Sequence, residues 1–70
     1  MGHFVLSQRE FLRVLRTHGF TPTSQRGSHQ YWEKPGHKVT VDVKYPEYSG
    51  WLVANMIRQS GLSKSAFLQR

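Results

Sequence analysis

Hydrophobic and polar positions repeat with two different periods along the chain, and each period predicts a different kind of element. In the stretch "SQREFLRVLRT" the apolar residues fall on one side of a helix and the arginines on the other, which predicts a helix over residues 8–17. Ser7, with Glu10 three residues later, forms a capping box at the helix start. Gly19 supplies the positive φ that commonly ends a helix.

A period of two follows, and it predicts three short strands at about residues 20–25, 29–33 and 38–44. Pro22 interrupts the first strand and assigns it to an edge of the sheet, because proline has no amide hydrogen to donate to a further neighbour. In the third strand, "KVTVDVK", the valines at positions 39, 41 and 43 alternate with polar residues. One face of this strand is therefore expected to be buried and the other open.

The turn at Pro35-Gly36 sets the register between the second and third strands. If these two residues form the whole turn, Trp32 lies opposite Val39 and His29 lies opposite Asp42. Pro-Gly favours a type II turn whereas tight hairpins prefer the primed types, and a slip of one residue would turn the partner strand over. Trp32 and the valines form the core set, so the open face is expected to carry His29, Tyr31, Glu33, Lys38, Thr40 and Asp42.

A second helix is predicted from "WLVANMIRQSG", where apolar residues recur at helical spacing and Gly61 follows as a cap. A short turn over residues 66–68 is expected to cover an edge of the core. The element order α-β-β-β-α predicts an α+β two-layer sandwich in which two helices cover one face of a three-stranded antiparallel sheet. The other face stays in water, and function is expected there.

The composition narrows the classes of function. Seventy residues favour a single domain over residues 1–70. The chain has no cysteine, which excludes a thiolate nucleophile and a cysteine metal site, and its four histidines are scattered, so we expect no metal and no other cofactor. Its apolar runs are short, so we expect no membrane span, no signal peptide and a cytoplasmic location. The net charge of +6 favours a polyanionic partner, either a nucleic acid or an acidic protein.

The stretch "RGSHQYW" groups residue types that can form an active site. Gly27 lets a ligand approach the backbone closely, and the Ser28 hydroxyl can donate a hydrogen bond. His29 follows, and a histidine ordinarily titrates near neutral pH, so it can accept a proton and later return it. Asp42, opposite His29 in the expected register, can orient the imidazole and stabilise its cation. It can equally be the solvated partner of an ordinary surface histidine.

Cations and aromatic rings accompany this stretch. Arg26 and Lys44 are placed to hold a phosphate, and Lys38 adds a third cation on the open face. Tyr31 and Tyr48 are the candidates for stacking on a base. The tryptophan at position 51 is expected to pack against the edge of the core instead.

Taken in order, a short helix with "GF" after it, "RGSHQYW", a Pro-Gly turn, "KVTVDVK" and "WLVANMIRQSGLS" resemble the HicA toxins of bacterial toxin–antitoxin modules. The likeness runs from about Ser7 to Leu68. Its most specific part is Gly-Ser-His followed by an aromatic strand and a Val-Thr-Val strand, closed by an Ile-x-x-x-Gly-Leu-Ser helix ending.

The resemblance implies a fold like the double-stranded-RNA-binding domain and an activity as an mRNA interferase, with His29 as the catalytic residue. It also implies a HicB-type antitoxin that covers the site and, with the toxin, represses their shared operon. Two features depart from the family pattern. The turn "KPGHK" is one residue shorter than the usual Pro-Asp-Gly version, and the strand ending "VDVK" stands where members often carry a proline and a histidine. Lys44 takes the place of that later histidine as a plain cation.

These residues are interpreted as a metal-independent endoribonuclease site in which His29 deprotonates a ribose 2′-hydroxyl and Arg26 or Lys44 neutralises charge on the phosphate. Two alternatives stay open: a non-catalytic RNA-binding module of the same fold, and an inactive relative whose basic surface serves only protein contact. A conventional double-stranded-RNA-binding domain has clustered lysines at the start of its last helix, whereas here that helix begins "GWLV" and carries only Arg58. Single-stranded RNA is therefore the expected ligand.

Overall fold

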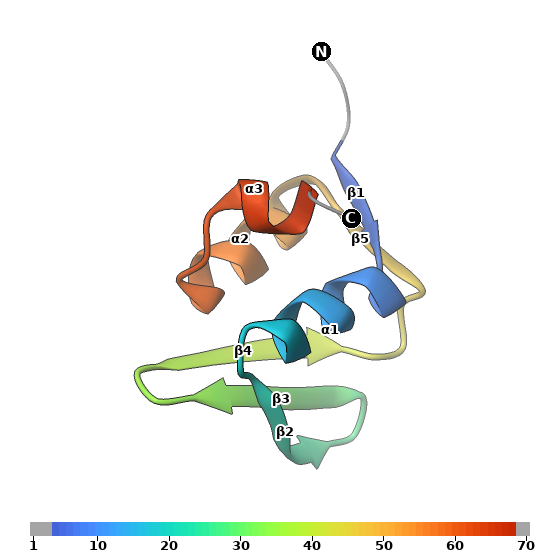
Figure 1. The fold of residues 1–70 in the computed structure, drawn as a ribbon. Coiled ribbons are helices and arrows are strands. Elements are labelled where there is room, and N and C mark those ends of the chain that lie inside the picture. The colour runs from blue at the N-terminus through green and yellow to red at the C-terminus, as the bar shows by residue number, and fades with distance from the viewer. Residues whose placement is uncertain (1–3, 69–70) are drawn as a thin grey trace.

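Residues 4–68, which the computed structural model describes, form three helices and two small antiparallel sheets (Figure 1). In chain order the elements are β1 (Val5–Ser7), α1 (Gln8–Thr17), β2 (Thr21–Arg26), β3 (His29–Lys34), β4 (His37–Asp42), β5 (Glu47–Ser49), α2 (Gly50–Ser60) and α3 (Lys64–Leu68). Figure 1 shows the three-stranded sheet at the bottom and the helices above it. The α+β class, with a helix before the sheet and two after it, is confirmed.

The first helix begins and ends as its sequence pattern predicts. The Ser7 hydroxyl accepts a hydrogen bond from the Glu10 amide at 3.1 Å, which satisfies one of the free N–H groups of the first turn. Phe11, Val14 and Leu15 are buried, whereas the arginines lie on the exposed side. One buried stripe and one charged stripe are what anchor an amphipathic helix to a core.

The main sheet has the strand order β2-β3-β4, and its register is the predicted one. Trp32 pairs with Val39 and His29 pairs with Asp42. Gly36 has φ 86° after a proline, which is the pattern of a type II turn, so the predicted register holds without a primed turn. In the hairpin between β2 and β3 the two central residues of the turn are Gly27 and Ser28. Gly27 has a positive φ, 61°, and Ser28 does not, which is the pattern of a type II′ turn.

A second sheet, of two short strands, was not predicted. β1 and β5 pair antiparallel, with Val5 opposite Ser49 and Leu6 opposite Tyr48. Each strand has three residues, which is too short to display a period of two. The pairing buries Leu6 and Tyr48. It also holds the start of α1 next to the start of β5, where the Gln8 amide donates to the Pro46 carbonyl at 2.8 Å.

The buried side chains form one cluster to which all three helices and both sheets contribute. Trp32, Val39 and Val41 supply the sheet side of the cluster. Val43 was expected with them, but it is only partly buried, because β4 ends at Asp42 and the chain turns there. α3 adds Phe67, which is buried and stacks on the ring of Phe11 at 4.9 Å between centroids.

α2 lies beside β4, and this placement shapes the open face of the sheet. The Gln59 side-chain oxygen accepts a hydrogen bond from the Thr40 amide of β4 at 3.1 Å. A strand at the edge of a sheet leaves such amides unpaired, so α2 covers part of the β4 edge. None of the helices in residues 4–68 is long and apolar enough to cross a membrane.

Candidate functional site

The hairpin between β2 and β3 carries His29 directly after its turn, paired with Arg26. Gly27 and Ser28 make the turn, and the Ser28 carbonyl accepts a hydrogen bond from the Val43 amide at 2.8 Å. That bond ties the turn to the chain just beyond β4. His29 and Asp42 are therefore held side by side at one end of the sheet.

His29 and Asp42 form a partly exposed charge pair. His29 Nε2 lies 3.8 Å from Asp42 Oδ2, which is beyond hydrogen-bond distance but within reach of electrostatic attraction. The His29 side chain is 55% exposed and that of Asp42 is 19% exposed. The imidazole can therefore meet a ligand from solvent while a carboxylate stands behind it.

The Asp42 carboxyl group is held in its ionised form by its surroundings. Desolvation raises the pKa of Asp42, but a hydrogen bond from Ser28, another from the Lys44 amide and the charges of Lys44 and His29 outweigh it. The pKa of Asp42 consequently lies below its ordinary value of 3.8. The Lys44 amide is 3.2 Å from Oδ1, and the buried Tyr48 hydroxyl donates to the Asp42 carbonyl at 2.8 Å.

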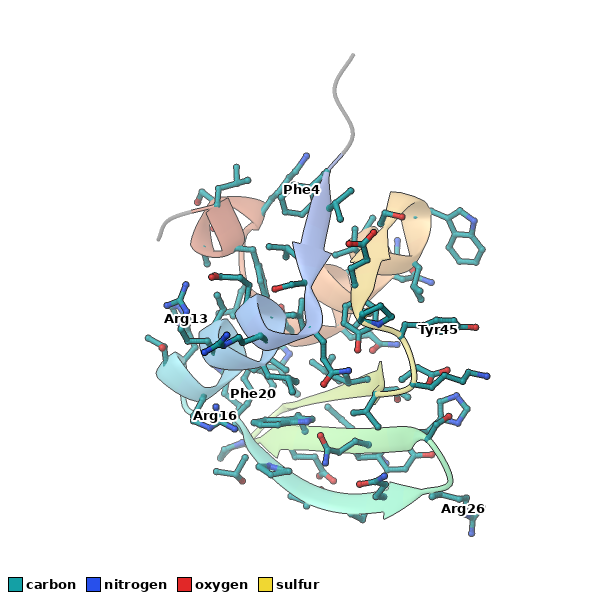
Figure 2. The ribbon with its side chains drawn as sticks, turned by 90° about the vertical axis from the view of Figure 1, so that its right-hand side faces the viewer. Phe4, Arg13, Arg16, Phe20, Arg26 and Tyr45 are labelled. Carbon is teal, nitrogen blue, oxygen red and sulfur yellow. The ribbon has the colours of Figure 1, made fainter. Side chains whose placement is uncertain are left out.

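The predicted cations do not all gather at His29. Arg26 pairs with His29 across the hairpin, and Figure 2 shows its side chain pointing away from the body of the protein. Lys44 lies with its Nζ 5.3 Å from the Tyr45 ring centroid. The Lys38 Nζ is 4.8 Å from the Tyr31 ring centroid. Lys38 pairs with Glu33, which lies four residues after His29 in β3. At about 3.3 Å per residue, that places Lys38 about 13 Å from His29 along the strand.

Two predictions about aromatic residues are wrong. Tyr48 was a candidate for stacking on a base, but its pairing in the second sheet buries it, and that burial raises the pKa of its phenol. Trp51 was expected to pack against the core, but it is 79% exposed at the start of α2. The unpredicted β5 explains the burial of Tyr48, since its pairing with β1 turns that ring inward.

A cavity of about 200 Å³ opens beside His29, between β4 and α2. It is lined by His29, Thr40, Asp42, Tyr45, Tyr48, Leu52, Asn55, Met56 and Gln59. Sequence reasoning missed Tyr45, Asn55 and Gln59, because only the tertiary placement of α2 against β4 brings them to His29. Asn55 and Gln59 are four residues apart, so they lie one turn apart on the same helix face, and this spacing was the signal in the sequence that they act together.

Within residues 4–68, no three histidine, aspartate or glutamate side chains gather in a group that could hold a metal ion.

The fold and the site together define a small basic α+β protein with an accessible histidine at the open end of a β-hairpin. The family model described as HicA toxin of bacterial toxin-antitoxin matches residues 8–62 of the 70-residue chain. The chain belongs to the HicA toxin family, and it is the toxin of a toxin–antitoxin system. Neither the comparison with curated proteins nor that with solved structures gives a match. The likeness to the double-stranded-RNA-binding domain stays a prediction.

Proposed function

We propose that this toxin is a metal-independent endoribonuclease that cleaves mRNA, with His29 as the general acid and base. The observation that carries the proposal is the position of His29 in a HicA-family chain. Its imidazole is accessible from solvent, faces the Asp42 carboxylate at 3.8 Å and borders a cavity. A general base has to reach the proton that it abstracts, and this ring is open to an incoming ribose.

In this mechanism the reaction is a transesterification. The neutral imidazole of His29 takes the proton of a ribose 2′-hydroxyl, and the resulting oxygen attacks the adjacent phosphorus. The bond to the 5′-oxygen of the next nucleotide breaks, a 2′,3′-cyclic phosphate forms, and the imidazolium returns its proton to the leaving oxygen. Asp42 stabilises the imidazolium between the two proton transfers. Positioned proton transfer of this kind contributes about 10²- to 10⁴-fold in rate.

Lys44 and Arg26 supply positive charge for the phosphate. Lys44 is the nearer to Asp42, where its charge is felt by the carboxylate. Arg26 extends from the hairpin that carries His29, so it suits a phosphate further along the strand of RNA. Gly27 and Ser28 form the turn between Arg26 and His29. Lys38, over the ring of Tyr31, offers a second contact for RNA further along the same face.

Single-stranded RNA is the substrate class that this surface favours. α2 has only one cation, Arg58, so it lacks the lysine cluster with which a duplex-binding domain grips phosphates. The exposed ring of Tyr45 and the partly buried ring of Tyr31 suit unpaired bases, which stack on aromatic side chains irrespective of sequence. The cytoplasm, where mRNA is translated, is the corresponding location.

A HicB-type antitoxin is the proposed partner that neutralises the toxin. Trp51 and Leu52 are 79% and 43% exposed at the start of α2, next to the cavity that Leu52 lines. Tryptophan is among the residues that most often anchor protein interfaces. An antitoxin that covers these two residues would close the cavity and shield His29.

The nuclease proposal is tested by adding purified wild type and His29→Ala to single-stranded RNA in EDTA. We expect the wild type to cut and His29→Ala to lose at least about 100-fold in rate, because the general base is removed. RNA with 2′-deoxy residues at the scissile positions should remain intact. His37→Ala, at the exposed tip of the other hairpin, is the matched control and should cut like the wild type.

Undiminished cutting by His29→Ala would contradict the assignment. RNA that shifts in a gel but is never cut by the wild type would favour the non-catalytic RNA-binding module instead. Normal growth after induced expression of the wild type would favour an inactive relative.

A further inference from the structure

The cavity between β4 and α2 lies directly beside His29, and the cleavage mechanism does not use it. His29 and Asp42 border it on the sheet side, while Leu52, Asn55 and Gln59 border it on the helix side. Its volume of about 200 Å³ is below the roughly 300–1,000 Å³ of sites for drug-sized ligands. The cavity therefore suits one planar ring rather than a larger molecule.

Two side-chain amides of α2 are oriented by partners that can only donate. Gln59 Oε1 accepts from the Thr40 amide at 3.1 Å, and Asn55 Oδ1 accepts from the Arg58 guanidinium. A backbone N–H and a guanidinium have no acceptor, so each amide must turn its oxygen toward its partner. The two NH₂ groups are then the free ends, and neither has a hydrogen-bond partner within residues 4–68.

An aromatic ring stands at the mouth of the cavity. Tyr45 lines it and is 43% exposed, and Figure 2 shows its side chain extending toward solvent from the connection between β4 and β5. The Lys44 ammonium lies over the ring, 5.3 Å from its centroid. Since the ammonium covers one face, the other face is left for a stacked base.

We propose that this cavity binds the base next to the scissile phosphate, and that Asn55 and Gln59 donate hydrogen bonds to it. Two donors are matched by a base that presents carbonyl oxygens. Uracil has two carbonyl oxygens, at C2 and C4, and no amino group. Cytosine and guanine each have one carbonyl and one amino group, and adenine has an amino group and no carbonyl; an amino group is itself a donor. The inference rests on the proposed nuclease function, because it places the base beside the phosphate at which His29 acts.

Near-isosteric acidic variants separate the two halves of each amide. Gln59→Glu and Asn55→Asp keep the oxygen that accepts from Thr40 or Arg58 and replace the free NH₂ by a second acceptor oxygen. The structural hydrogen bond survives, and only the group offered to the base changes. A loss of base preference in these variants cannot then be attributed to a lost contact between α2 and β4.

The test measures binding of 2′-deoxyuridine and 2′-deoxycytidine hexanucleotides to the full-length wild type and to each variant. The two bases have rings of the same size, and the missing 2′-hydroxyl prevents cleavage by the proposed mechanism. We expect the wild type to prefer the uridine hexamer by about tenfold, as one good pair of base contacts provides. In Gln59→Glu and Asn55→Asp that preference should disappear or reverse.

Ala54→Glu is the matched control, because it adds the same charge to an exposed position of α2 outside this cavity. It should weaken both hexamers equally and keep the preference. Equal binding of the two hexamers by the wild type, or a preference that the acidic variants retain, would overturn the inference. Parallel cleavage of ribonucleotide hexamers distinguishes the two proposals. A cut without base preference contradicts the base site alone, and a base preference without a cut contradicts the nuclease alone.

Discussion

At the scale of single residues, Asp42 connects the hairpin turn, the end of β4 and the imidazole. Its side chain takes hydrogen bonds from Ser28 and from the Lys44 amide, and its carbonyl accepts from Tyr48. Because those donors fix the carboxylate, its charge faces His29 without a direct hydrogen bond. A fixed charge of this kind stabilises an imidazolium at no cost in reorganisation at the moment of proton transfer.

Asp42→Asn should make the stability of the fold less sensitive to acid. A carboxyl group whose pKa is lower in the folded state contributes stability above its unfolded-state pKa, and that contribution is lost as the pH falls through the folded value. The wild type should therefore lose stability relative to Asp42→Asn as the pH falls below 3.8. Thermal unfolding of both proteins between pH 7 and pH 2.5 measures the difference.

A constant difference in melting temperature over that range would contradict the prediction. Glu47→Gln removes the same charge from an exposed position of β5 and controls for net charge. Asp42→Asn should also slow RNA cleavage at neutral pH without preventing RNA binding.

Alternation and turn length were enough to predict that His29 and Asp42 face each other, because both are properties of neighbouring strands. The surroundings of that pair could not be predicted in the same way. Gln59 contacts Thr40 although it lies 19 residues further along the chain. Tyr45 lies in the connection between β4 and β5, where hydrophobic and polar residues do not alternate regularly. Such contacts depend on how elements pack, which neither spacing nor propensity encodes.

At the scale of elements, the end of α2 meets the tip of the β3–β4 hairpin. Gly61 has φ 72° and follows the last residue of the helix, so it adopts the left-handed conformation that favours glycine. A Cβ added to Gly61 would overlap the imidazole of His37. The helix cap and the hairpin tip are therefore packed against one another.

Gly61→Ala should cost more stability than Gly19→Ala. Both glycines have a positive φ, which costs an alanine about 1–2 kcal/mol, but a Cβ on Gly19 meets no atom within 4 Å. The excess for Gly61→Ala should vanish in a His37→Ala background, because the overlap is then removed. Urea unfolding of the wild type, the two glycine variants, His37→Ala and the two double variants provides the comparison. Equal losses for the two single glycine variants would contradict the packing of the cap against the hairpin.

Elements with a local signature were predictable, and those without one were not. α1 has a capping box and a clear apolar stripe, and its bounds of Gln8–Thr17 agree with the predicted residues 8–17. β1 and β5 are three residues each, and their pairing joins residues 40 or more positions apart in the chain. A strand of that length is defined by its partner rather than by its own sequence.

At the scale of the whole molecule, a small core leaves little stability in reserve. A chain of about 60 residues buries only about 60% of the surface that its unfolded form exposes. α3 is the last described element, and Phe67 is its one buried residue. The stacking of Phe67 on Phe11 therefore attaches the end of the chain to the first helix.

Phe67→Ala should destabilise the protein by about 3–5 kcal/mol, the usual cost of removing a buried phenylalanine ring. That is a large share of the roughly 5–15 kcal/mol by which domains are stable, so part of the population should unfold near 37 °C. Leu68→Ala is the control, because Leu68 is 52% exposed and should change stability by less than about 0.5 kcal/mol. Chemical denaturation measures both, and similar midpoints for the two variants would show that α3 does not contribute to the core.

The two tryptophans occupy opposite environments, and this gives the protein a pair of intrinsic fluorophores with separate meanings. Trp32 is 1% exposed beneath the Arg16 guanidinium, whereas Trp51 is 79% exposed. Emission from Trp32 should be shifted to the blue and shielded from iodide, and emission from Trp51 should be shifted to the red and readily quenched. One unlabelled sample can thus report unfolding through the first indole and the docking of a protein on α2 through the second.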